Sequence, residues 1–66
     1  MRKVVLVPVV TVDWWEGRSS EQKERLIAGI SKAFTDLGID VGSLHIIIHD
    51  IPKTNWGNAG KQASKM

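Results

Sequence analysis

The side chains best suited to chemistry in this 66-residue sequence are two histidines and an arginine. His45 and His49 lie four residues apart in the apolar run Leu44–Ile51, so on a strand they share one face. Such a pair can hold a metal, but two ligands on one strand are weak evidence, and ordinary hydrogen-bonded histidines are commoner. Arg18 is either a solvated charge or a planar, bidentate partner for a carboxylate. We therefore expect no metal site.

Pro8 is unexpected where it stands, because it lies inside the apolar run Leu6-Val-Pro-Val-Val10, which otherwise resembles a buried strand. Proline has no backbone N–H for a sheet ladder, so it is found on edge strands, at strand starts or at bulges. The surrounding stretch Val4–Trp15 is dense in β-branched and aromatic residues, which favours a strand covered on both faces. We expect Pro8 to lie where no ladder partner needs its nitrogen.

A helix is predicted to begin at Ser19, which can act as N-cap with Gln22 at the capping-box position. Gly38 suits the end of this helix. Gly29 inside it costs up to about 1 kcal/mol relative to alanine, which would fit close packing there. Between the two ends runs one apolar stripe at helical spacing: Leu26, Ile27, Ile30, Ala33, Phe34 and Leu37.

A second strand is predicted over Leu44–Ile51, ended by Pro52, and the tail from Lys53 is polar and contains glycine. The order strand, helix, strand predicts an α/β fold in which the two strands are parallel with a right-handed connection. A two-stranded sheet covered by one helix leaves its other face bare. We expect this bare face to pack on another copy of the chain.

Size and composition support assembly. A chain of this length buries only about 60% of its unfolded surface, and the absence of cysteine excludes disulfides and thiolate metal sites. The net charge of +2 is scattered along the chain, which is weak evidence for nucleic-acid binding. The apolar stretch Val4–Val12 is about half the length of a membrane helix, and no signal peptide is visible. We expect a cytoplasmic homo-oligomer with neither nucleic-acid nor membrane partners.

From Pro8 the chain reads P-V-V-T-V-D-W-W-E-G-R-S-S-E-Q-K, and N-W-G-N-A-G follows the second strand. These segments resemble the 4-oxalocrotonate tautomerase family of the tautomerase superfamily. The resemblance runs from Pro8 to about Lys65, with one residue fewer than expected between helix and second strand. It predicts a single domain over residues 1–66, with residues 1–7 as an N-terminal strand extension and residues 8–65 as the family-matching core.

The resemblance implies a βαβ protomer with parallel strands that dimerises sheet to sheet and forms a hexamer, as a trimer of dimers. It also implies an isomerase without metal or organic cofactor. A free N-terminal proline amine would move a proton within a small 2-oxo or 2-hydroxydienoate carboxylic acid. A general base works best with a pKa near the operating pH, and an apolar, cation-lined pocket lowers the pKa of an amine toward that range.

By the same resemblance, Pro8 matches the catalytic proline and Arg18 the arginine that binds a substrate carboxylate. His45 stands where the typical isomerase has a second arginine, which polarises the 2-oxo group. Histidine is neutral for much of the time near pH 7 and has no fork geometry. This replacement argues against a 4-oxalocrotonate-like diacid as the substrate.

Three further residues are candidates for the substrate pocket. Trp56 matches the aromatic pocket wall, with plugging of a subunit interface as the equal alternative. Asn58 replaces an apolar residue near the same pocket. Trp14 and Trp15 suit an interface or core, and Trp15 is the better pocket candidate of the two because it directly precedes E-G-R.

Pro8 departs from the family pattern because residues 1–7 precede it. Its nitrogen is then a tertiary amide, which is no base at neutral pH. Translation could start at Val7, or a protease could cut between Val7 and Pro8, and either event would free the amine. If the extension is genuine, the alternative function is a non-catalytic or catalytically impaired subunit, in a homohexamer or a mixed hexamer.

Overall fold

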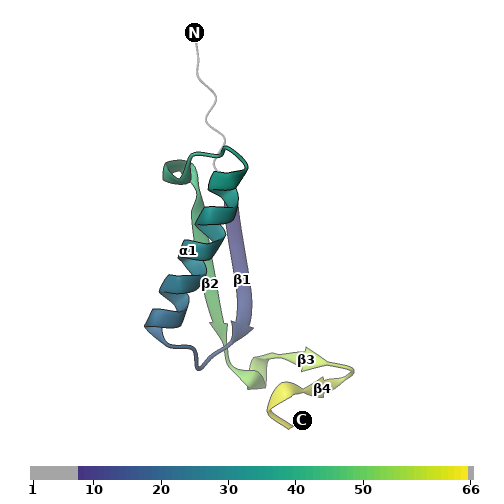
Figure 1. Cartoon of the computed structure of the whole chain (residues 1–66). Helices are drawn as coiled ribbons and strands as arrows, with labels where there is room; N and C mark the ends of the chain where they lie inside the picture. Colours follow the sequence, from purple (N-terminus) through teal and green to yellow (C-terminus); the bar gives the residue numbers. More distant parts are fainter. Residues whose placement is uncertain (1–7, 66) are drawn as a thin grey trace.

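The computed structural model of this chain describes residues 8–65. Its main sheet has two strands, β1 (Val9–Trp15) and β2 (His45–Ile51), joined by the helix α1 (Ser20–Asp36) (Figure 1). A short hairpin of β3 (Gly57–Asn58) and β4 (Lys61–Gln62) follows. Single 3₁₀ turns occupy Val41–Ser43, Lys53–Asn55 and Ala63–Lys65.

β1 and β2 are parallel, with Val9 opposite His45 at one end and Trp15 opposite Ile51 at the other. The predicted order of strand, helix and strand and the parallel pairing are therefore confirmed. Pro8 directly precedes β1, as expected for a residue without a backbone N–H. The Val4–Val7 part of the predicted first strand lies outside the described residues.

The helix begins as its sequence predicts. Ser19 is the N-cap, and its hydroxyl oxygen accepts a hydrogen bond of 3.1 Å from the backbone N–H of Gln22. The Gln22 side-chain oxygen accepts one of 2.9 Å from the backbone N–H of Ser19. This reciprocal capping box satisfies two amides that the first helical turn leaves without partners.

The helix ends in a Schellman motif around Gly38, which has φ of +83°. The Gly38 N–H donates to the Thr35 carbonyl at 2.9 Å, and the Ile39 N–H donates to the Phe34 carbonyl at 3.1 Å. Glycine adopts the left-handed conformation at this position without the strain of a Cβ atom. The predicted terminal glycine is thereby confirmed.

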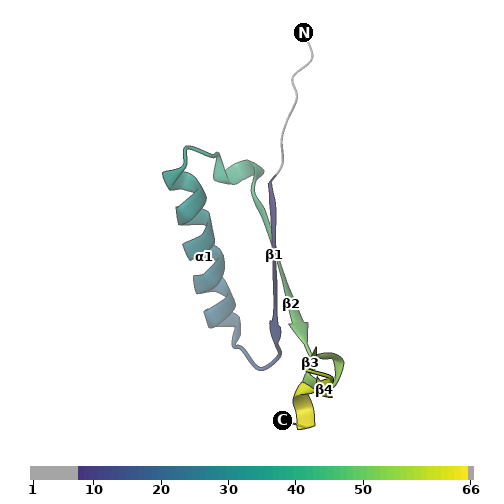
Figure 2. The same cartoon turned by 90° about the vertical axis from the view of Figure 1, so that its right-hand side faces the viewer.

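α1 lies on one side of the β1–β2 sheet, and no other element of residues 8–65 covers the opposite side (Figure 2). On the helix, Leu26, Ile30 and Phe34 are half-buried. The rest of the predicted stripe stays outside this contact: Ile27 is 40% exposed and Leu37 is 75% exposed. A single chain thus uses only part of its apolar helix surface.

The open face of the sheet is formed by the side chains that point away from α1. Strand alternation assigns to this face Val9, Thr11, Asp13, Trp15, His45, Ile47, His49 and Ile51, all of them exposed except the half-buried Ile51. Val9 is 55% and Ile47 46% exposed, and Ala63, 5% exposed, is the one buried apolar residue within 8–65. Packing of this face on another copy stays a prediction, and its physical reason is that the described residues 8–65 form no closed core.

The β3–β4 hairpin adds to the predicted order of elements and projects from the end of the main sheet (Figure 1). Asn58 pairs with Lys61, so Ala59 and Gly60 form a two-residue turn. Both turn residues have positive φ, 55° and 78°, which is the requirement of a type I′ hairpin turn. The Ala63 N–H donates to the Trp56 carbonyl at 2.8 Å and folds the tail back against the hairpin.

A polar link joins the helix to the sheet at the end where β2 stops. The Trp14 indole N–H donates to Asp50 Oδ1 at 2.7 Å, and the Lys23 ammonium forms an ion pair with Asp50 Oδ2. The hydrogen bond from Lys23 is the largest cause that lowers the pKa of Asp50, and the hydrogen bond from Trp14 lowers it further.

Within the part of the chain that the structure describes, no helix has the length and apolar character needed to cross a membrane.

Substitution by alanine should change the free energy of unfolding in opposite directions at the two glycines of the helix region, Gly29 and Gly38. A Cβ atom at Gly29 or at Gly38 meets nothing within 4 Å, so backbone conformation alone decides its effect in this chain. Gly38→Ala should lower the free energy of unfolding by about 1 kcal/mol because of its positive φ. Gly29→Ala should raise it by up to about 1 kcal/mol through helix propensity. Urea unfolding at one protein concentration measures both, and destabilisation by Gly29→Ala would instead indicate close packing against another copy.

The link through Asp50 predicts a pH-dependent contribution to stability. Because the folded-state pKa is lowered, the contribution is full above the unfolded-state pKa of about 3.9 and is lost as pH falls through the lower folded-state pKa. Asp50→Asn should therefore lower the urea midpoint at pH 7, and this difference from wild type should shrink below about pH 4.

The exposed pair Lys32–Asp36 supplies the control for this measurement. Its atoms lie 3.3 Å apart, and its side chains are 79% and 66% exposed. Asp36→Asn should change the midpoint little at pH 7, since exposed ion pairs contribute little to stability. A difference between wild type and Asp50→Asn that stayed constant from pH 7 to pH 2.5 would contradict the assigned role of the Asp50 carboxylate.

Candidate active site

Pro8 and His45 lie together at the end of the sheet where both strands begin. The Pro8 carbonyl accepts a hydrogen bond of 3.0 Å from the backbone N–H of His45. Pro8 is half-buried, and the His45 side chain is exposed on the open face of the sheet. Pro8 therefore contributes its carbonyl to the ladder, which leaves its nitrogen outside the pairing of β1 with β2.

The opposite end of the sheet has a hollow of about 230 Å³, lined by Asp13, Trp14, Trp15, Arg18 and Trp56. The rings of Trp15 and Trp56 meet edge to face, with centroids 5.9 Å apart and an angle of 78° between their planes. The Arg18 guanidinium lies over the Trp14 ring, 5.6 Å from its centroid. The structure thus brings Trp15, Arg18 and Trp56 together, three of the residues that the sequence predicts for a substrate site.

The charged side chains around this hollow make different contacts. The Asp13 carboxylate is 2.7 Å from His49 Nδ1, its neighbour across the strands. The Lys53 ammonium lies 4.7 Å from the centroid of Trp15. The Arg18 guanidinium carbon lies over the Trp14 ring, and its N–H groups are suited to a carboxylate acceptor. A hollow lined by one cation and by aromatic rings is suited to a small conjugated carboxylate.

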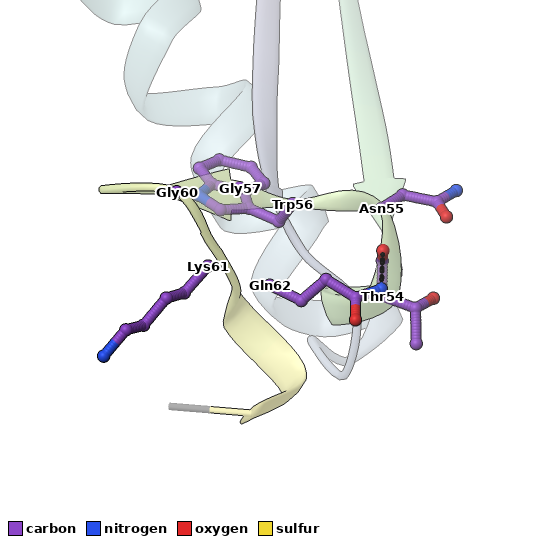
Figure 3. Close-up of a pocket in the computed structure, with 7 residues that line it drawn as sticks. All are labelled: Thr54, Asn55, Trp56, Gly57, Gly60, Lys61 and Gln62. Atoms are coloured by element: carbon purple, nitrogen blue, oxygen red, sulfur yellow. Dashed lines mark hydrogen bonds between the residues drawn. The ribbon is translucent and has the colours of Figure 1, made fainter.

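A larger hollow of about 350 Å³ lies next to Trp56, between the 3₁₀ turn Lys53–Asn55 and the hairpin (Figure 3). The Gln62 side chain spans it by donating a hydrogen bond of 2.9 Å to the Thr54 carbonyl. The Lys61 ammonium points away from the other labelled side chains. Apart from Trp56, this hollow contains none of the predicted site residues, so the smaller hollow at Arg18 is the better candidate for chemistry.

The remaining predicted residue, Asn58, lies on the hairpin opposite Lys61, is exposed, and does not line the hollow at Arg18. Conversely, Asp13 and Trp14 line that hollow without having been selected from the sequence as site residues. Their position at the end of the first strand, next to Glu16-Gly17-Arg18, was the available signal. No group of three metal-binding side chains occurs within residues 8–65.

The length of β1 separates the two groups of site residues. Its seven residues span about 23 Å at about 3.3 Å per residue. Pro8 precedes this strand and Arg18 follows it. One chain therefore cannot bring Pro8 and Arg18 to the same small substrate.

Known proteins share this fold and sequence pattern. The family model described as "Tautomerase enzyme" matches residues 8–66. The 2-hydroxymuconate tautomerase of Comamonas testosteroni is 36% identical over 61 residues, which cover 91% of this chain and 97% of that protein. The crystal structure of YwhB, a homologue of 4-oxalocrotonate tautomerase, has a TM-score of 0.84 and 33% identity over 89% of this chain and 98% of that one.

A further solved structure is the heterohexamer 4-oxalocrotonate tautomerase from Chloroflexus aurantiacus J-10-fl. It has a TM-score of 0.79 and 27% identity, covering 89% of this chain and 97% of that chain. The family model begins at Pro8, the residue that directly precedes β1. On this agreement of sequence, strand order and length, the chain belongs to the 4-oxalocrotonate tautomerase family of the tautomerase superfamily.

Proposed function

We propose that this protein is a cofactor-independent tautomerase of a small 2-oxo or 2-hydroxydienoate carboxylic acid, with the Pro8 nitrogen as general base when it is a free amine. The observation that carries the proposal is the hollow that Arg18 lines together with the contacting rings of Trp15 and Trp56. Arg18 binds the substrate carboxylate, and the two rings exclude water from the conjugated chain.

In the proposed reaction the amine takes a proton from one atom of the substrate and a proton returns to another atom of the same substrate. No electron leaves the substrate, so neither an oxidant nor a reductant is needed. Negative charge develops on the 2-oxygen during the transfer, and a hydrogen-bond donor there lowers the barrier. His45 is the candidate donor because it lies beside Pro8 at the same end of the sheet.

The proposed site is shared between two copies of the chain, because the whole of β1, which spans about 23 Å, lies between Pro8 and Arg18. The outer edge of β1 has no strand partner within residues 8–65. Antiparallel pairing of two β1 edges about a two-fold axis places the Pro8 end of one copy beside the Arg18 end of the other. The proposed dimer thereby forms two sites, each with Pro8 from one copy and Arg18, Trp15 and Trp56 from its partner.

A second candidate function follows from the bond between Val7 and Pro8. While this bond is intact, the Pro8 nitrogen is an amide and the subunit lacks the proposed base. The similar heterohexamer from Chloroflexus aurantiacus shows that members of this fold family occur in mixed assemblies. The alternative is therefore a subunit that supplies Arg18 and its hollow to a partner chain with a free N-terminal proline.

A chain that begins at Pro8 separates the two functions. It should catalyse the ketonisation of phenylenolpyruvate, measured by the loss of enol absorbance, while the chain with residues 1–7 should be about 10²-fold slower or inactive, because only an amine can act as the base. Pro8→Ala in the shorter chain should lose this activity. Arg18→Ala should raise KM about tenfold through loss of the charged contact. If the chain beginning at Pro8 is folded but inactive, Pro8 catalysis is refuted.

Mixing two impaired variants, assayed at low substrate concentration, tests the shared site. Pro8→Ala and Arg18→Ala chains, both beginning at residue 8, should each be impaired alone and regain activity when they are unfolded and refolded together. Random pairing gives one intact site in each mixed dimer, so about a quarter of all sites should recover. Separate refolding followed by mixing on ice is the control, because chains that cannot exchange form no mixed sites. Absence of recovery in jointly refolded, folded chains would contradict a site shared between two copies.

A further inference from the structure

Trp14 connects the candidate carboxylate anchor to the link between helix and sheet. Its ring lies under the Arg18 guanidinium, with 5.6 Å between Arg18 Cζ and the ring centroid. Its indole N–H donates to Asp50 at 2.7 Å, directly across the parallel strands. Lys23 of α1 holds the other oxygen of the same carboxylate. The indole N–H of Trp14 is therefore held by Asp50, while a face of its ring lies toward Arg18.

The Asp50 carboxylate determines the orientation of this ring. Asp50 accepts from Trp14 and from Lys23 on different oxygens, so its own position is set from both the sheet and the helix. The Trp14 side chain is half-buried on the helix side of β1, whereas Trp15 is on the open face. An indole with a bonded N–H and one packed side keeps few alternative rotamers.

Arg18, in contrast, has no such fixed surroundings of its own. It lies in the connection between β1 and α1, and it is exposed. A long arginine side chain in such a position samples many rotamers, and each one lost on binding weakens affinity. Stacking on an aromatic face restricts the guanidinium while its N–H edge stays available for a carboxylate.

We propose that Trp14 is a positioning residue, which holds the Arg18 guanidinium at the mouth of the hollow so that it meets the carboxylate of a 2-oxo acid already oriented. This inference rests on the proposed role of Arg18 as the carboxylate anchor. It assigns Trp14 no contact with the reacting atoms. The competing role for Trp14 is packing between helix and sheet, which would affect folding but not Arg18 in particular.

NMR spectroscopy of the full chain tests the placement of Arg18 without any ligand. The side-chain Nε–Hε resonance of Arg18, assigned by its loss in Arg18→Ala, should be shifted upfield by the Trp14 ring current. Arg25, which is exposed on α1, is the internal reference. The upfield shift should persist in Trp14→Phe, which keeps a ring, and disappear in Trp14→Leu. An Arg18 resonance that coincides with that of Arg25 in wild type would overturn the proposal.

Calorimetric binding of benzoylformate, a 2-oxo carboxylate that cannot enolise, tests the consequence for the anchor. Trp14→Leu should weaken its binding to the full chain about two- to fivefold, the range expected for an exposed cation–π contact, and Trp14→Phe should weaken it less. The uncharged methyl ester should bind wild type and Trp14→Leu alike. In an Arg18→Ala background Trp14→Leu should have no further effect, because Trp14 acts through Arg18.

The outcomes separate this inference from the function on which it rests. If wild type does not bind benzoylformate, or Arg18→Ala does not weaken its binding, the anchor role of Arg18 and the proposed function both fail. If Arg18→Ala weakens binding but Trp14→Leu does not, only the positioning role fails. An equal loss from Trp14→Leu in the presence and absence of Arg18 would assign Trp14 to packing. Circular dichroism of each variant verifies that it is folded.

Discussion

The direction of a single strand governs the rest of this molecule. β1 carries Pro8 at its start and Arg18 just beyond its end, and seven extended residues between them span about 23 Å. A helical connection between these two residues would have been less than half as long, at about 1.5 Å per residue. Because the strand is straight and paired with β2, it cannot fold back to close the gap. Chemistry that needs both residues therefore needs a second copy of the chain, and we expect the exposed face of the sheet to pack on another copy as well.

The stability of the fold and the proposed chemistry would both gain from association between copies of the chain. Within residues 8–65 only Ala63 is buried among the apolar residues, and Val9, Ile47 and Leu37 remain exposed. Burial of apolar surface stabilises a fold by about 25 cal/mol per Å². The described residues bury little such surface among themselves, so they gain little of this stabilisation. An association that covers the open face would stabilise the fold. Pairing of the β1 edges, which is a separate contact, would complete the proposed site.

Local rules were sufficient to predict the helix and both main strands, because their signals lie within a few residues of each other. Ser19 and Gln22 form the capping box that their spacing indicates, and Gly38 ends the helix in the conformation that glycine favours. The hairpin was less visible because alanine at position 59 is an unusual residue for a turn that needs positive φ. The contact of Trp14 with Asp50 depends on strand register, which is a property of residues 36 positions apart. No local pattern contains that information.

The fold and the proposed chemistry make different demands on Pro8. The sheet uses only its carbonyl, which accepts from the His45 N–H, and this bond is indifferent to what is attached to the proline nitrogen. The proposed reaction uses only the nitrogen, and it requires a free amine. A chain can therefore keep every contact described for β1 and β2 while its base is blocked by one peptide bond. The same separation applies to Arg18, whose place over Trp14 depends on the far end of the sheet. A subunit without a working base would accordingly still keep the proposed carboxylate-binding end, which is why the two proposed functions share one structure and differ at a single bond.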